Sequence, residues 1–106
     1  MIHELKRYEA TTGNAQALRD RFAKVTMPIF RRLGITVLHC WDAEDDTASF
    51  YYLVSFPGEQ ARAAAWEAFG GDPEWKAAKA ASESDGPLLA RQTTTLLYPA
   101  EFSPAS

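Results

Sequence analysis

The sequence predicts an α+β protein with a ferredoxin-like split βαβ arrangement, in which helices pack on a four-stranded antiparallel sheet. The patterns along the chain follow the order strand, helix, strand, strand, helix, strand, with short connections and one hairpin in the middle. The chain has 106 residues, of which 46% are hydrophobic and 24% charged, a composition typical of a globular protein with one modest core. We therefore expect a single domain over residues 1–106.

The first third of the chain predicts one strand and one helix. Residues 1–10 alternate with a period of two, which is typical of a strand. Asn14 is suited to cap the helix that follows, because apolar residues recur at helical spacing over residues 15–29. We expect this helix to bend near Pro28 and to end at Gly34.

The middle of the chain predicts a hairpin. Residues 35–41 and 49–56 are rich in β-branched and aromatic side chains, and the acidic stretch 42–48 between them is suited to a solvated turn. This stretch lacks the glycine and the distal glutamate of a calcium-binding loop, which favours the turn over a cation site.

An interrupted helix follows the hairpin. The pattern becomes helical from Glu59, and Gly70 with Gly71 is expected to end that helix. Asp72 can cap a new helix, and Pro73 fits its first turn because no amide donor is needed there. The break lets three large aromatic side chains meet over one patch of the sheet: Trp66, Phe69 and Trp75.

The chain closes with a strand and a tail. Residues 88–99 predict the last strand, after the loop at residues 82–87. The proline-punctuated tail, residues 100–106, is expected to pack through Phe102.

Composition and charge argue against several classes of function. The net charge is −3 and the basic residues are spread along the chain, so we expect no nucleic-acid partner. No apolar run is long enough to span a bilayer and a strand pattern begins at the first residues, so we expect no membrane partner and a cytoplasmic location. With one cysteine, two histidines and no phosphate-binding glycine loop, we expect no metal and no cofactor. Cys40 is interpreted as a buried, inert strand residue.

The strands predict a homodimer. An antiparallel sheet with helices on one side normally has a polar second side, but residues 35–41 and 49–56 carry apolar side chains on both faces. The uncovered face must meet a partner, and a second copy of the same sheet satisfies this under two-fold symmetry. We expect two sheets to face each other.

Four stretches of this sequence resemble the NIPSNAP family, within the dimeric α+β barrel superfamily. They are ELKRY at residues 4–8, VLHCW at 37–41, RAAAWEAFGGDPEW at 62–75 and LLYPAEFSP at 96–104. The resemblance covers nearly the whole chain and implies the fold and the dimer, and it does not imply a reaction. Lys6 stands where the family commonly has Arg, and Lys offers a point charge without the planar fork.

The first strand offers the best constellation for chemistry. Glu4, Lys6 and Tyr8 lie on one face, with neighbours roughly 7 Å apart. In an enclosed cavity, a carboxylate, an ammonium and a phenol could polarise and deprotonate a bound phenol or ketone, with Glu4 and Tyr8 catalytic and Lys6 binding the ligand. The alternative is structural: Glu4 and Lys6 form an ion pair at an interface, with Tyr8 packed beside them.

The remaining candidates are a histidine and four aromatic residues. His39 is interpreted as an interior histidine, with a general-base or proton-shuttle role as the catalytic alternative. Trp41, Trp66, Phe69 and Trp75 are interpreted as core residues, with the lining of an aromatic ligand pocket as the alternative.

Two functions follow from these alternatives. The first is a dimeric barrel that binds an apolar or aromatic small molecule, with cofactor-independent oxygenase or isomerase chemistry by analogy with other members of the superfamily. The second is a non-catalytic interaction or scaffold protein, in which the rings serve folding and dimerisation. In both, Arg31, Arg32 and Arg62 are interpreted as solvated helix residues.

Overall fold

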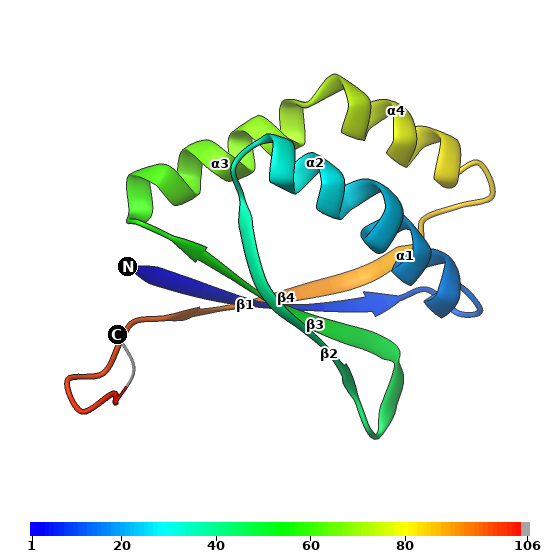
Figure 1. The fold of residues 1–106 in the computed structure, drawn as a ribbon. Helices are drawn as coiled ribbons and strands as arrows, with labels where there is room; N and C mark the ends of the chain where they lie inside the picture. Colours follow the sequence, from blue (N-terminus) through cyan, green and yellow to red (C-terminus); the bar gives the residue numbers. More distant parts are fainter. Residues whose placement is uncertain (105–106) are drawn as a thin grey trace.

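A computed structural model describes residues 1–104 as a four-stranded antiparallel sheet with helices on one side (Figure 1). The strands are β1 (Ile2–Ala10), β2 (Thr36–Ala43), β3 (Asp46–Phe56) and β4 (Leu89–Leu97). Their order in the sheet is β2-β3-β1-β4, and all neighbours are antiparallel. This is the order that a split βαβ arrangement produces, so the predicted fold class is confirmed.

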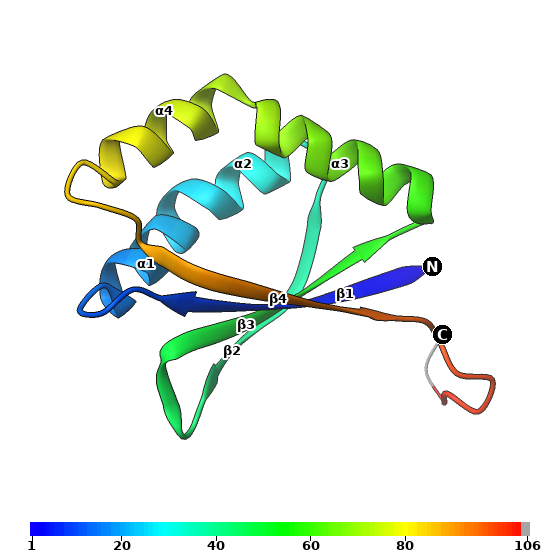
Figure 2. The same cartoon turned by 180° about the vertical axis from the view of Figure 1, so that it is seen from behind.

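The helices cover a single face of the sheet. They are α1 (Ala15–Arg21), α2 (Met27–Arg32), α3 (Glu59–Gly71) and α4 (Pro73–Ser82), with the π-helical segment η1 (Phe22–Thr26) between α1 and α2. Figures 1 and 2 show them above the sheet from both sides, with the other face bare. We call that bare face the open face. Among residues 1–104, no helix is long and apolar enough to cross a membrane.

The core lies between the helices and the sheet. Alternate residues of β1 and β3 point to this side, and the register places Tyr8 opposite Phe50 and Lys6 opposite Tyr52. Phe30 from α2 is fully buried against these strands, and the centre of its ring is 4.8 Å from that of Phe69 on α3. The buried apolar cluster contains Ala10, Leu18, Phe22, Phe30, Ile35, Phe50, Tyr52, Val54, Phe56 and Leu88.

The first helical segment is irregular at η1, which lies just before Pro28, the position at which we predicted a bend. The amide of Met27 donates to the carbonyl of Phe22, a five-residue spacing that widens the helix at η1. A regular helix would press the ring of Pro28 against the carbonyl of Lys24, and the wider turn just before the proline relieves that clash. Gly34, at φ +78°, ends the segment as predicted.

The break between α3 and α4 is made by Asp72 rather than by the two glycines. α3 continues through Gly70 and Gly71, so the predicted stop is two residues too early. Asp72 is extended because the α region is disfavoured before Pro73, and its carboxylate accepts a hydrogen bond from the amide of Trp75 at 2.9 Å. Asn14 holds the cap position of α1, but its side chain donates to Thr11 instead of capping the helix.

The β2–β3 hairpin is longer than predicted. The strands pair up to a turn that contains only residues 44–45. Asp42 accepts hydrogen bonds from Arg19, the shorter at 2.9 Å, and Asp46 accepts one from Arg7 at 2.6 Å. The predicted turn is therefore confined to residues 44–45, because Asp42 and Asp46 belong to the strands; Asp42 is nevertheless 79% exposed, as the prediction of a solvated stretch requires.

The tail after β4 hooks below the end of the sheet (Figure 1), where Tyr98 and Ala100 line one pocket with His3 and Leu53 of the open face. Phe102 is 90% exposed, so the prediction that it packs is wrong. The amide of Ser103 donates to the carbonyl of Ala100, which forms a local turn. Residues 105 and 106, which the expected domain and tail include, lie outside the described residues.

Candidate functional site

A fully buried carboxylate lies between β1 and α3. Glu4 is 0% exposed, and its Oε1 accepts hydrogen bonds from Arg62 Nε at 2.6 Å and from Trp66 Nε1 at 2.9 Å. Its Oε2 forms an ion pair with Lys6 Nζ at 2.9 Å. We call Glu4, Lys6, Arg62 and Trp66 the Glu4 cluster.

The local spacing of the chain brings these four side chains together. Glu4 and Lys6 are two residues apart on a strand and share the face covered by the helices. Arg62 and Trp66 are four residues apart on α3 and share the helix face that packs on β1. The interpretation of Arg62 as a solvated residue is therefore wrong. The four-residue spacing between Arg62 and the core residue Trp66 could have predicted that Arg62 lies on the packed face of the helix.

The electrostatics of the cluster keep Glu4 ionised. Burial alone raises the pKa of this carboxyl, but the hydrogen bonds from Arg62, Trp66 and Lys6 outweigh it and lower the pKa below its ordinary value. A carboxylate with a low pKa and both oxygens occupied is a weak base. These contacts favour the ion-pair interpretation, and a catalytic role for Glu4 stays a prediction.

Lys6 connects the Glu4 cluster to the edge strand β4. Its Nζ donates to Thr94 Oγ1 at 3.1 Å and to Gln92 Oε1 at 3.5 Å. The ammonium also lies 4.8 Å from the centre of the Trp66 ring, within the range of a cation–π contact.

A pair of tyrosines lies beside the cluster. The Tyr52 hydroxyl donates to the Tyr8 hydroxyl at 2.9 Å, and the two rings meet edge to face at 5.1 Å. Burial raises the pKa of Tyr8, while its bond from Tyr52 and the charge of Arg21 oppose that rise. Burial also raises the pKa of Tyr52, well above its ordinary value. Both phenols are therefore protonated at neutral pH.

A pocket of about 200 Å³ opens next to Tyr8, beneath α4. Phe69 and Trp75 stack with their ring centres 4.8 Å apart, and Arg21 lies 5.1 Å from the centre of the Trp75 ring. Arg21 is held by Glu83 at 2.8 Å. We call this the α4 pocket. It is lined by Tyr8, Leu18, Arg21, Phe22, Thr26, Phe69, Gly70, Trp75, Lys79, Leu89 and Gln92.

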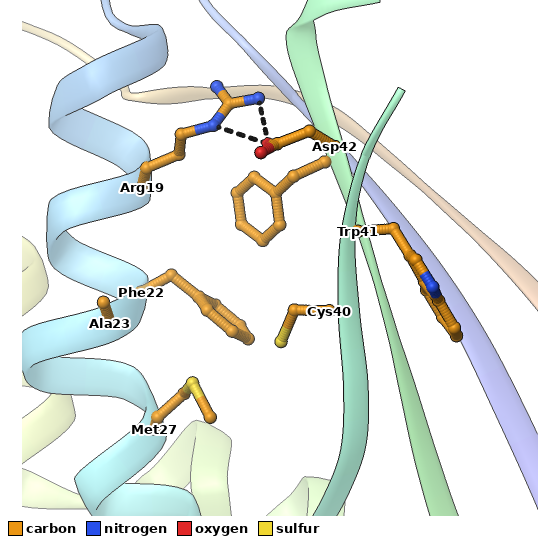
Figure 3. A pocket seen from close by; sticks show the side chains of 8 residues that line it. Arg19, Phe22, Ala23, Met27, Cys40, Trp41 and Asp42 are labelled. Atoms are coloured by element: carbon orange, nitrogen blue, oxygen red, sulfur yellow. Dashed lines mark hydrogen bonds and ion pairs between the residues drawn. The ribbon is translucent and has the colours of Figure 1, made fainter. Parts of the chain in front are cut away.

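A second pocket, of about 240 Å³, lies between α1, η1 and β2 (Figure 3). Cys40 points toward Phe22, and Arg19 holds Asp42 at one side, whereas Trp41 points away from the other side of the strand. Cys40 is exposed, so its interpretation as a buried residue is wrong, because β2 is an edge strand. Partial shielding still raises the pKa of its thiol. This pocket is more open to solvent than the α4 pocket, and neither pocket is lined by a residue of the Glu4 cluster.

Six of the eight candidate residues lie on the helix side of the sheet. Glu4, Lys6 and Trp66 meet in the Glu4 cluster, and Tyr8, Phe69 and Trp75 line the α4 pocket. The predicted aromatic patch is confirmed, because the Trp66 and Phe69 ring centres are 6.4 Å apart and Phe69 stacks on Trp75.

His39 and Trp41 lie on the open face, separated from the other candidates by the sheet. A register irregularity between Val37 and His39 places Val37 opposite the buried Val54 but His39 opposite Leu53, which belongs to the other face. His39 is exposed, and its ring centre is 5.5 Å from that of Trp41. The interpretations of His39 as interior and of Trp41 as core are therefore wrong.

In residues 1–104, no three side chains of His, Cys, Asp or Glu gather as ligands for a metal ion.

Comparison with known families assigns the chain. The sequence profile of the NIPSNAP family matches residues 3–104. The chain belongs to the NIPSNAP family. No curated protein matches it.

Solved structures share the fold of this NIPSNAP protein. An uncharacterised NIPSNAP domain protein from Burkholderia xenovorans is 24% identical, with a TM-score of 0.81 over 99% of this chain and 100% of that one. A NIPSNAP family protein from Agrobacterium tumefaciens is 16% identical, with a TM-score of 0.83 over 99% and 98% of the two chains. A protein named as an antibiotic biosynthesis monooxygenase is 10% identical, with a TM-score of 0.64 over 94% and 99%. At these identities the likeness concerns the fold alone.

Proposed function

We propose that this NIPSNAP protein binds an apolar or aromatic small molecule in the α4 pocket. The observation that carries the proposal is the pocket itself, in which stacked Phe69 and Trp75 face a few convergent polar groups from Tyr8, Arg21 and Gln92. Small-molecule sites commonly combine apolar walls with a small number of placed polar groups. An apolar cavity of about 150 Å³ accommodates benzene, so the volume of about 200 Å³ suits one ring with a short substituent.

Turnover of this ligand, by cofactor-independent oxygenase or isomerase chemistry, is a separate part of the proposal. Its support is Tyr8, whose protonated hydroxyl could stabilise an oxyanion that forms on a bound ketone or phenol. If the protein is instead a non-catalytic scaffold, the α4 pocket binds no ligand. A binding measurement therefore discriminates between the ligand-binding function and the scaffold function.

The binding test uses the three tryptophan side chains as separate reporters. In a ¹⁵N correlation NMR spectrum each indole N–H gives its own signal, and Trp→Phe variants assign them. We expect single-ring aromatic compounds to shift the Trp75 signal, because Trp75 lines the pocket. Trp41, on the opposite face of the sheet, is the internal control and should not move. A Trp75 signal that no compound of a single-ring library shifts at millimolar concentration contradicts the proposal.

We also propose that the protein forms a homodimer through its open face. Large apolar side chains are exposed there, with Trp41 at 46% and Leu97 at 42%. The charged residues of this face pair with one another, as Arg7 does with Asp46 at 2.6 Å and with Glu9 at 3.3 Å. Two copies can therefore approach without leaving an unpaired charge in the interface.

Sedimentation velocity at micromolar concentration tests the dimer. The Trp41→Lys variant should form a weaker dimer, with a larger dissociation constant than the wild-type protein, because lysine places a charge in the contact. Ala63→Lys, on the exposed side of α3, is the matched control and should leave the association unchanged. A wild-type protein that sediments as a monomer at tens of micromolar rules out this proposal.

A further inference from the structure

We infer that the α4 pocket is specific for an aromatic ring that carries a neutral carbonyl group, and that the Tyr8 hydroxyl donates a hydrogen bond to the carbonyl oxygen. This inference rests on the proposed function, because it names the ligand class of the same pocket.

The hydrogen-bond count of the tyrosine pair provides the first step. Each phenol has one proton to donate, and Tyr52 gives its proton to the Tyr8 hydroxyl. The Tyr8 proton has no acceptor among residues 1–104. The reverse direction would leave the donor of Tyr52, a fully buried residue, unsatisfied, which is the costlier arrangement. Tyr8 is thus a donor in need of an acceptor.

The position of Tyr8 provides the second step. Tyr8 lines the α4 pocket, so the acceptor can come from a molecule bound there. The bond from Tyr52 also polarises the Tyr8 hydroxyl, because an oxygen that accepts a hydrogen bond becomes a better donor. The phenol is neutral over the physiological range, so it donates to an oxygen ligand at every relevant pH.

The charges around the pocket favour a neutral ligand over an acid. Arg21 is the buried cation of the lining, and its Nη1 already bonds Glu83 Oε2 at 2.8 Å and Ser82 Oγ at 3.1 Å. Its charge is therefore largely balanced inside the protein. Lys79 is 52% exposed and is 3.6 Å from Glu83, so water screens it. A carboxylate ligand would lose its hydration and gain only the water-screened charge of Lys79, because Arg21 already binds Glu83.

The apolar walls determine the shape of the ligand. Phe69 and Trp75 offer a stacked aromatic wall, and Leu18, Phe22 and Leu89 complete an apolar lining. A flat ring can pack against these side chains while one substituent reaches Tyr8. An aryl ketone or aryl aldehyde with a single ring satisfies the volume, the apolar walls and the donor together.

The experiment compares two ligands of the same shape. Acetophenone and α-methylstyrene differ only in that a carbonyl oxygen replaces a CH₂ group, and benzoate is the anionic third probe. Dissociation constants come from titrations that follow the Trp75 indole signal in the full-length protein. We expect acetophenone to bind about three- to tenfold more tightly than α-methylstyrene, the gain of one net hydrogen bond. Benzoate should bind more weakly than acetophenone.

The Tyr8→Phe variant assigns the preference to the hydroxyl. It should bind α-methylstyrene as the wild-type protein does and lose the preference for acetophenone. Tyr98→Phe, the same substitution on a residue that is 64% exposed, is the matched control and should keep the preference. A preference that persists in Tyr8→Phe overturns the role of Tyr8.

The outcomes separate the two proposals. If no compound of the single-ring library, these two included, shifts the Trp75 signal, the proposed function fails and the inference fails with it. If other single-ring compounds shift the signal but acetophenone does not, the proposed function holds and the inferred ligand class is wrong. If both bind equally, or if benzoate binds most tightly, the pocket is a ligand site but the inferred ligand class is wrong. These comparisons need only the wild-type protein, so the ligand class is decided even if Tyr8→Phe does not fold.

Discussion

The Glu4→Gln variant tests whether the buried ion cluster holds α3 on the sheet. Glu4 is 0% exposed and receives donors at 2.6, 2.9 and 2.9 Å from Arg62, Trp66 and Lys6. Glutamine has the same shape, but its amide group would face the Lys6 ammonium, donor against donor, and both cations would lose their buried anion. Because Lys6 and Arg62 are partly exposed, we expect a loss of about 3 kcal/mol in the free energy of unfolding, the lower end for a broken buried pair.

The pH dependence of this loss has a defined sign. The pKa of Glu4 is lower in the folded protein than its ordinary value of 4.5, so the folded state binds this proton more weakly than the unfolded state. The stability that Glu4 contributes is complete above the unfolded value and is lost as the pH falls through the folded value. Protonated Glu4 resembles glutamine. The difference between the wild-type protein and Glu4→Gln should therefore shrink below about pH 4.5.

Urea unfolding from pH 7 to pH 3 at one fixed protein concentration is the assay. Urea is uncharged and does not screen the ion pairs, and the fixed concentration removes any effect of association. Glu59→Gln is the matched control, because Glu59 bonds the same Arg62 at 3.1 Å but is 62% exposed. Its loss should stay below about 1 kcal/mol. Equal losses for the two variants at pH 7, or a Glu4→Gln loss that is unchanged at pH 3, would refute the reasoning.

Two further predictions concern the ends of helices. Asp72→Ala should lower the free energy of unfolding by about 1–2 kcal/mol, because the amide of Trp75 loses its cap and Arg32 its ion pair at 2.8 Å. Asp72→Asn keeps the capping oxygen, so its free energy of unfolding should fall by less. Thermal unfolding of both variants measures this difference, and equal losses of stability would exclude a capping role. Gly34→Ala should destabilise by about 1 kcal/mol because φ is +78°, whereas Gly70→Ala, within α3, should stabilise by roughly 0.5–1 kcal/mol. Changes of the same sign at the two glycines would contradict this conformational argument.

The aromatic patch and the start of α4 could be predicted because their signals are local. Asp72 and Pro73 specify the start of α4 through one side-chain bond and one missing amide. Trp66, Phe69 and Trp75 meet because the break falls between Phe69 and Trp75 and changes the direction of the chain, so that the Trp75 ring stacks on Phe69. None of these contacts depends on a partner far away in the sequence.

The candidate site depends on distant partners and was predicted only in part. The alternation of residues 1–10 placed Glu4, Lys6 and Tyr8 on one face, as observed. The donor that Glu4 binds most closely, Arg62, is 58 residues away, and Tyr52, the partner of Tyr8, is 44 residues away. Only the packing of α3 and β3 against β1 brings them into contact.

The sequence by itself determined the order of the elements, the antiparallel sheet and the side of β1 that carries polar groups, because period and capping chemistry are encoded within a few residues. The tertiary structure decided on which side of the sheet the residues of β2 lie. Simple alternation places Val37, His39 and Trp41 on one face, but the irregular register after Val37 directs His39 and Trp41 to the open face. A shift of one residue exchanges the two faces of a strand, and pairing with β3 sets that register.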